Sequence, residues 1–133
     1  MNYIEKIEHE GKLLSIIIRR NYSSSGIKFF TPNDFSQQLG YMNHPKGYCI
    51  QPHIHNQVKR EVSYTQEVLL VKSGKVKVNF FNQEKIFLES KIIVTGDVIL
   101  LAHGGHGFEM LEASEMIEVK QGPYSGELDK KML

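Results

Sequence analysis

The chain has 133 residues, of which 41% are hydrophobic and 23% charged, and this composition is ordinary for a globular protein. The length fits a single domain with its own core and is too short for two independent domains. The formal net charge is +1 and the basic residues are scattered, which argues against nucleic acid as a partner. The one cysteine excludes an internal disulfide, and no apolar run suits a signal peptide or a membrane span. We therefore expect a cytoplasmic protein with no membrane partner.

Residues 1–46 are predicted to form strands joined by turns. The segment 12–20 (KLLSIIIRR) is rich in β-branched side chains and ends at a Ser/Gly turn, which predicts a strand. Residues 27–30 are predicted to be its partner strand. Residues 31–39 begin with Thr-Pro and have the pattern of a short helical turn, and residues 43–47 (NHPKG) are typical of another turn.

The second half of the chain predicts a regular succession of short strands. In residues 75–80, Val and Phe alternate with Lys and Asn, the period of a strand with one face in water. Further strands are predicted at 67–72, 85–88, 91–95, 97–101, 108–111 and 115–120. Short strands separated by glycines predict an all-β sandwich or barrel. The polar C-terminal tail, residues 122–133, is expected to pack as a cap or to fray.

Four of the six histidines lie in two short windows, His53 with His55 and His103 with His106. If residues 53–55 form a strand, the side chains of His53 and His55 project from one face about 7 Å apart. Two imidazoles so placed can bind one ion, because a metal–nitrogen bond is only about 2 Å long. A His-x-His pair alone is weak evidence, since such pairs also occur on ordinary surfaces.

The spacing of glycines and a glutamate around these histidines strengthens the indication. In chain order the pattern is Gly47, five residues, His53-Ile54-His55, then Glu67, six residues, Gly74, and later Gly96, five residues, Ala102, Gly104 and His106. It resembles the two sequence blocks of the cupin superfamily over residues 47–110, about half the chain.

The resemblance implies a cupin double-stranded β-helix, a jelly-roll-like barrel, formed by residues 1–133 as a single domain. It also implies one divalent metal ion inside the barrel, which would be Fe, Mn, Zn, Ni or Co. The metal ligands by resemblance are His53, His55, Glu67 and His106.

Both blocks depart from the family pattern. Eleven residues separate His55 from Glu67, whereas the family has three or four, so Glu61 competes with Glu67 as the acidic ligand. We favour Glu67 because it leads into an apolar strand and keeps its distance to the following glycine. In the second block His106 comes one residue early, which leaves His103 as a minor competitor.

Residues that share a strand face with the predicted ligands are expected to line a pocket for a small molecule. Gln51 shares a face with the His-x-His pair, and Phe108 and Met110 share one with the later histidine. Tyr64 and Glu109 are further candidates for substrate contacts near the mouth of the pocket. No residue is assigned a catalytic role.

By the same resemblance, we expect a metal-dependent protein that acts on a small oxygen-rich metabolite. A sugar or nucleotide-sugar is the leading substrate class, with an isomerase or epimerase reaction. An Fe(II)-dependent dioxygenase and a non-enzymatic sugar- or metal-binding module remain open alternatives. A homodimer is also expected, with residues 12–20 pairing across a two-fold axis.

Overall fold

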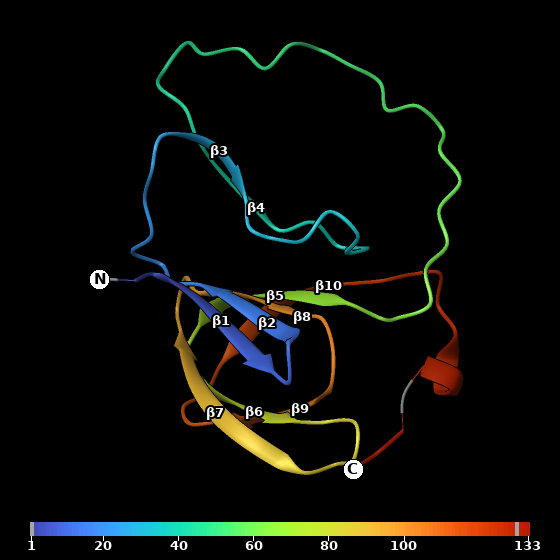
Figure 1. Cartoon of the computed structure of the whole chain (residues 1–133). Helices are drawn as coiled ribbons and strands as arrows, with labels where there is room; N and C mark the ends of the chain where they lie inside the picture. The colour runs from blue at the N-terminus through green and yellow to red at the C-terminus, as the bar shows by residue number, and fades with distance from the viewer. Residues whose placement is uncertain (1, 130) are drawn as a thin grey trace.

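The regular structure is almost entirely β-strand (Figure 1). The computed structural model describes residues 2–129 and 131–133. In chain order their elements are β1 (Ile4–His9), β2 (Lys12–Ile18), β3 (Gly26–Phe29), β4 (Gly40–Asn43), β5 (Glu67–Ser73), β6 (Lys75–Phe81), β7 (Phe87–Val94), β8 (Val98–Leu101), β9 (Gly105–Met110), β10 (Glu115–Lys120) and the 3₁₀ helix η1 (Gly126–Asp129). The all-β prediction is confirmed. Among the described residues, no helix has the length and apolar character needed to span a membrane.

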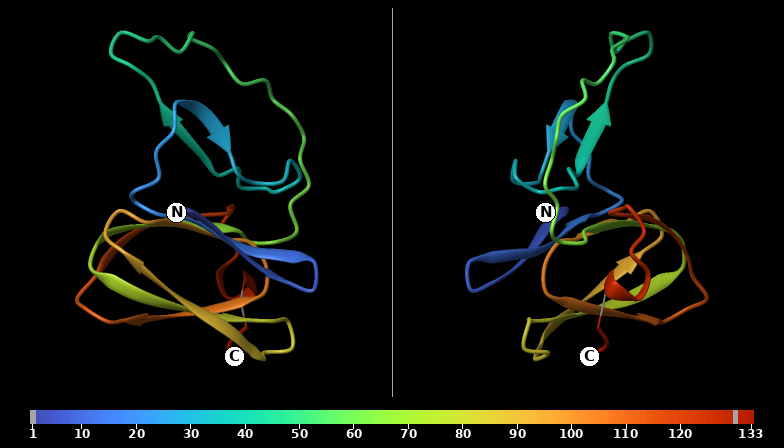
Figure 2. Two further views of the ribbon diagram at one scale, coloured as in Figure 1. Left: turned by 60° about the vertical axis from the view of Figure 1, so that its left-hand side comes forward. Right: turned by 90° about the vertical axis from the view of Figure 1, so that its right-hand side faces the viewer.

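Two large sheets face each other and a small third sheet stands apart from them (Figure 2). The large sheets have the strand orders β1-β2-β8-β5-β10 and β7-β6-β9, and the small one is the β3–β4 hairpin. We call the two large sheets the sandwich. From β5 onward the chain passes repeatedly between them, with β5, β8 and β10 in one sheet and β6, β7 and β9 in the other. The described strands do not close into a barrel, because each large sheet ends in edge strands.

The core lies between the two large sheets. On β6, Val76, Val78 and Phe80 are at most 1% exposed, whereas the residues between them are half-buried, which confirms the predicted alternation. The remaining buried members of this cluster are Ile7, Leu14, Ile17, Leu69, Val71, Ile93, Ile99 and Leu101. A smaller cluster on the outer face of the five-stranded sheet, built on Ile16 and Leu100, is covered by side chains from residues 30–39.

Four local predictions need correction. The strand predicted at residues 27–30 exists as β3, but it pairs with β4 and not with residues 12–20. Residues 85–88 and 91–95 are not two strands, because β7 runs without interruption along β6 as far as Val94. Residues 31–39 contain no helix, only a turn in which the Phe35 N–H donates to the carbonyl of Pro32. The strands β1 and β4 were not predicted, since their side chains lack a clear alternation. They become strands by hydrogen bonding to β2 and β3, respectively.

The predicted pairing of residues 12–20 across a two-fold axis is wrong. Strand β2 is hydrogen-bonded to β1 on one side and to β8 on the other, so it has no free edge. A strand whose two edges are both used cannot add a strand from a second chain. The homodimer itself stays a prediction and needs a different contact.

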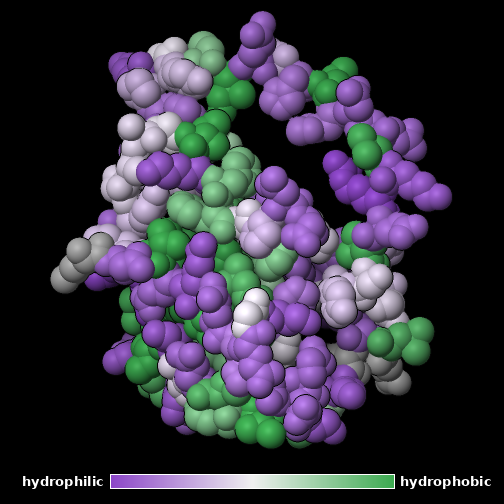
Figure 3. Space-filling view, viewed as in Figure 1, coloured by the Kyte–Doolittle hydropathy of each residue, from purple (hydrophilic) through white to green (hydrophobic). Residues whose placement is uncertain are grey.

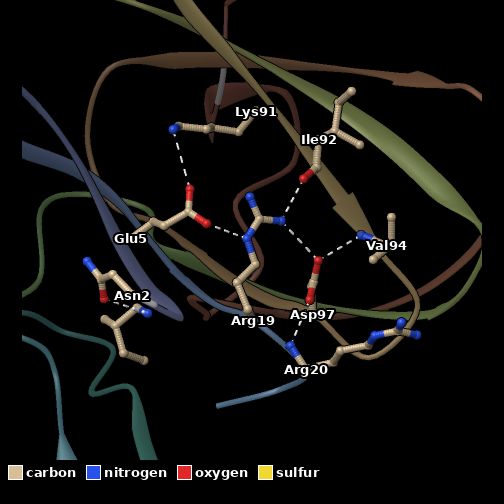
Figure 4. A network of polar contacts seen from close by, with 9 residues as sticks. Asn2, Glu5, Arg19, Arg20, Lys91, Ile92, Val94 and Asp97 are labelled. Atoms are coloured by element: carbon tan, nitrogen blue, oxygen red, sulfur yellow. Dashed lines mark hydrogen bonds and ion pairs between the residues drawn. The ribbon is translucent and has the colours of Figure 1, made fainter.

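A buried carboxylate connects β2, β7 and β8 (Figure 4). Asp97 is 1% exposed and immediately precedes β8. It accepts hydrogen bonds from Nη1 of Arg19 at 3.0 Å, from the Arg20 N–H at 2.8 Å and from the Val94 N–H at 2.8 Å. Three donors satisfy a buried anion that would otherwise be costly to remove from water.

Glu5 extends this network on β1. Its carboxylate accepts a hydrogen bond from Nε of Arg19 and lies 3.3 Å from Nζ of Lys91. The hydrogen bond from Arg19 outweighs the effect of partial burial and, with the positive charges of Arg19 and Lys91, holds the pKa of Glu5 below its usual range. A carboxyl group whose pKa is lowered by folding stabilises the folded state above the unfolded-state pKa of about 4.3.

Glu5→Gln is therefore expected to lower the free energy of unfolding by about 1–2 kcal/mol at pH 7. The difference in free energy of unfolding between the wild type and Glu5→Gln should shrink as the pH falls below about 4. In that range Glu5 of the wild type takes up a proton when the chain unfolds, and this favours the unfolded state. Urea unfolding at pH 7 and pH 3.5 measures both quantities. Glu8→Gln, an exposed position on the same strand, is the matched control and should change little at either pH.

Candidate functional site

Glu67 and His106 form a polar pair across the sandwich. Glu67 is the first residue of β5 and His106 the second residue of β9, so they belong to opposite sheets. His106 is the register partner of buried Phe80, and paired residues project to the same face, so its side chain points inward. Nε2 of His106 lies 3.2 Å from Oε1 of Glu67, and the two side chains are 28% and 15% exposed.

The surroundings keep Glu67 ionised. The hydrogen bond with His106 has the largest effect, and together with contact to Glu118 and the charges of His106 and Lys120 it outweighs burial. The result is a pKa of about 2 for Glu67. At neutral pH this carboxylate is an anion and an acceptor of hydrogen bonds.

The pair lines a cavity of about 1070 Å³. The polar side chains in its wall include Tyr64, Glu67, His103, His106, Glu118 and Lys120, and its apolar wall includes Phe81, Phe108, Leu128 and Leu133. This volume is enough for a molecule the size of a sugar or a nucleotide-sugar. Apolar walls with a few convergent polar groups are typical of small-molecule sites.

The C-terminal tail closes part of this cavity. Asp129 of η1 lies 2.7 Å from Nζ of Lys120 and accepts a hydrogen bond from the hydroxyl of Thr65. Leu133 lies against Gly105 at the start of β9, close enough that a Cβ added to this glycine would be 3.0 Å from it. Of the two alternatives predicted for the tail, packing as a cap is the one seen in the structure.

His103 lies at the same end of the sandwich. Its ring makes edge contacts with Phe35 and Tyr64, with ring centroids 5.7 and 5.2 Å away. Burial, followed by the charge of Lys12, lowers the pKa of His103. A histidine that loses its proton easily is neutral at physiological pH and can act as hydrogen-bond donor or acceptor in the cavity wall.

The His-x-His pair lies elsewhere, in a long segment between β4 and β5. We call residues 44–63 the arm. It contains a turn near residues 46–47 but no strand or helix, and it extends away from the sandwich before returning to β5 (Figures 1 and 2). The space-filling view shows an opening between the arm and the rest of the molecule (Figure 3).

Both histidines are exposed there. The rings of His53 and His55 lie 5.1 Å apart, and Nδ1 of His53 is 2.8 Å from the carbonyl oxygen of Gln51. The strand predicted through this pair is absent, because the arm has no neighbouring strand to pair with. Glu61, the competing acidic ligand, is also exposed in the arm.

The structure thus brings together two of the four predicted metal ligands, Glu67 with His106. Among the described residues, no group of three or more His, Cys, Asp or Glu side chains is placed to hold a metal ion. Protein metal centres use three or four side-chain ligands, so a single Glu–His pair does not complete one. With the arm in this position the residues do not fit a metal ion, and the metal prediction depends on where the arm lies.

Of the predicted substrate contacts, Tyr64 and Phe108 lie in the cavity wall. Gln51 is in the arm, and Glu109 faces away from the cavity on β9. Met110 shares the inward face with His106 and Phe108 but lies outside the cavity wall at the end of the strand, where it is 49% exposed.

Sequence reasoning missed Glu118 and Lys120, which also line the cavity. They alternate with Ile117 and Val119 on β10, so the sequence shows that Glu118 and Lys120 share one face of that strand. Only the register of β10 with β5 shows that this face points inward.

Comparisons with protein-family models, with curated proteins and with solved structures gave no match. The resemblance to cupins therefore depends on the spacing of the residues named above.

Proposed function

We propose that this protein is a cupin-type domain that binds a small oxygen-rich molecule between its two large sheets. The observation that carries the proposal is the ionised Glu67, hydrogen-bonded to His106 in the wall of a cavity of about 1070 Å³. The passage of β5 to β10 between two facing sheets is the winding expected of a jelly roll and supports the cupin assignment.

The chemistry of the wall favours a ligand with several hydroxyl or carbonyl oxygens. Glu67 accepts hydrogen bonds from hydroxyl groups, Lys120 donates to carbonyl or phosphate oxygens, and the ring of Phe108 offers an apolar face to a sugar ring. A sugar or nucleotide-sugar combines these features, and it is the substrate class that we propose.

In an isomerase or epimerase reaction, a base removes a proton from the carbon next to a carbonyl group. We assign this proton transfer to His106, with Glu67 as the positioning residue that fixes the orientation of the imidazole. Lys120, on the neighbouring strand and ion-paired with Asp129, would use a remaining N–H to stabilise the negative charge that develops on the carbonyl oxygen.

A second form of the proposal has one divalent metal ion, held by Glu67 and His106 together with His53 and His55, in which His106 would be a ligand of the ion in place of the base. Such an ion would supply Lewis-acid chemistry to a bound oxygen. It requires the histidines of the arm to move beside the Glu–His pair.

A thermal-shift screen tests this function. We expect the melting temperature of the wild type to rise with one of Mn, Fe(II), Co, Ni or Zn and with a sugar, nucleotide-sugar or small acid, since a ligand of the folded state stabilises it. Glu67→Gln should weaken ligand binding by about 30-fold, because it removes a charged hydrogen-bond acceptor at the centre of the cavity.

Glu109→Gln is the matched control, since it removes a carboxylate from β9 on the face away from the cavity. Equal shifts for the wild type and Glu67→Gln would contradict the proposed site. Oxygen consumption with a bound substrate would identify a dioxygenase instead, and saturable binding with no turnover would identify a binding module.

A further inference from the structure

A carboxylate of the C-terminal tail lies in the cavity wall with a donor on each of its oxygens. Oδ2 of Asp129 is 2.7 Å from Nζ of Lys120, and Oδ1 accepts a hydrogen bond from the hydroxyl of Thr65. The side chain of Asp129 is 14% exposed, and all three residues line the cavity. Proteins commonly bind a carboxylate or a phosphate group by hydrogen bonds to two of its oxygens, at least one of them from a charged donor.

The two donors belong to the sandwich and not to the tail. Lys120 is the last residue of β10, and Thr65 lies two residues before Glu67, the first residue of β5. Strands β5 and β10 are paired with Lys120 opposite Glu67, and the N–H of Gln121 donates to the carbonyl of Gln66 just beyond them. Backbone pairing therefore keeps Thr65 and Lys120 in place when the tail moves.

The large apolar side chains of the tail are mostly in water. Tyr124, Leu128 and Met132 are 96%, 93% and 80% exposed. The ion pair is also partly in water, since Lys120 is 39% exposed, and exposed ion pairs contribute little to stability. A segment with so little burial opens at a low cost in free energy. Another anion can therefore take the place of Asp129.

We propose that Thr65 and Lys120 form a subsite for an anionic group of the ligand, a phosphate or a carboxylate, and that Asp129 fills this subsite until the ligand binds. The inference rests on the proposed function, because it places the anionic group on the ligand that contacts Glu67. Lys120 and Glu67 are opposite each other on paired strands, so their Cβ atoms are about 5 Å apart. The ligand therefore carries its anionic group close to the hydroxyl groups that Glu67 binds.

The exchange of Asp129 for the ligand gives the tail a role in selecting ligands. The tail closes part of the cavity, with Leu128 and Leu133 in the wall. A ligand with an anionic group replaces the hydrogen bonds of Asp129 and releases the tail, whereas an uncharged ligand leaves Asp129 on Lys120. An ammonium group has three N–H donors, so Lys120 binds the anionic group and still donates to the carbonyl oxygen of the substrate.

Asp129→Asn tests this competition. The substitution keeps the size of the side chain and removes its charge, so the subsite is open in a larger fraction of molecules. Titrations with inorganic phosphate and, separately, with acetate are followed by the backbone amide shifts in ¹H–¹⁵N spectra. At least one of these anions should bind Asp129→Asn about fivefold more tightly than the wild type. The anion that does so shows whether the group is a phosphate or a carboxylate.

Two further variants control for net charge and for the subsite itself. Glu115→Gln removes one negative charge from the far end of β10, about 17 Å from Lys120 and beyond the Debye length of about 8 Å at 0.15 M salt. It should bind both anions as the wild type does. Lys120→Gln added to Asp129→Asn removes the charged donor, so it should weaken anion binding by about tenfold or more.

Motion of the tail is a second measurement on the same samples. The ¹H–¹⁵N heteronuclear NOE reports fast backbone motion at each residue. A saturating concentration of the anion should lower its value at Leu128 and Leu133 in the wild type and leave the values in β5 and β10 unchanged. A tail that is only a structural cap would keep its NOE values.

Equal affinities of the wild type and Asp129→Asn would overturn the inference, and so would an anion that binds without changing the motion of the tail. Equal binding with and without Lys120→Gln would exclude the subsite. If neither anion binds to any of the variants, the subsite is also overturned. The proposed function is decided separately by the thermal shifts of the wild type and Glu67→Gln with uncharged sugars, which do not require an anionic group.

Discussion

Asp97→Ala is expected to lower the free energy of unfolding by about 3–5 kcal/mol, because it removes the acceptor of a buried charged pair. The side chain is 1% exposed and receives Arg19 and two backbone N–H groups. Without it, Arg19 keeps only Glu5 and the carbonyl of Ile92, and the N–H groups of Arg20 and Val94 lose their partner. Urea unfolding followed by far-ultraviolet circular dichroism measures the change.

A surface ion pair provides the control. Glu115 lies 3.7 Å from Lys72, and both side chains are more than 60% exposed. Glu115→Ala should cost less than about 1 kcal/mol, since water and salt screen such pairs. If Asp97→Ala were no more destabilising than Glu115→Ala, the hydrogen bonds of Asp97 to β2 and β7 would contribute no more to the free energy of unfolding than a surface ion pair does.

Gly74→Ala is the second substitution with a large expected effect, about 3 kcal/mol or more. Gly74 joins β5 to β6 with a φ of +107°, a conformation that side chains other than glycine rarely adopt. A Cβ at this position would lie 2.2 Å from Oγ of Ser114 and 2.6 Å from the carbonyl oxygen of Ala113. The turn and the neighbouring chain would both have to move.

Two other glycines separate the cost of the backbone conformation from the cost of the steric clash. Gly11 has a φ of +75° with no atom within 4 Å of an added Cβ, so Gly11→Ala should show only the backbone cost of about 1–2 kcal/mol. Gly107 has open space as well and no positive φ, so Gly107→Ala should change stability by less than about 1 kcal/mol. Equal melting temperatures for the Gly74 and Gly11 variants would show that the close contact with Ser114 relaxes at no cost.

The sequence predicted two residues of the candidate site, Glu67 and His106, but not that they contact each other. The spacing from Glu67 to Gly74 and from Gly96 to His106 pointed to the two residues that meet across the sandwich. Each of these spacings lies within a short segment of the chain. The meeting itself depends on β5 and β9 lying in opposite sheets, which no local pattern encodes.

The sequence by itself determined the strands whose side chains alternate or are β-branched. The alternation of Val76, Val78 and Phe80 fixed the inward face of β6, and the isoleucines of residues 12–20 fixed β2 as a strand. These signals are local, because a strand exposes alternate side chains to opposite faces whatever its neighbours are.

Only the tertiary structure decided which strands are neighbours. It placed β2 inside a sheet, gave β1 and β4 their partners, and turned Glu118 and Lys120 toward the cavity through pairing with β5. It also left His53 and His55 in an arm outside the sandwich, because a strand needs hydrogen-bonding partners that its own sequence does not supply. Backbone pairing joins segments that are far apart in the chain. The conformation of the arm therefore depends on whether a strand is available to pair with it, which its own sequence does not determine.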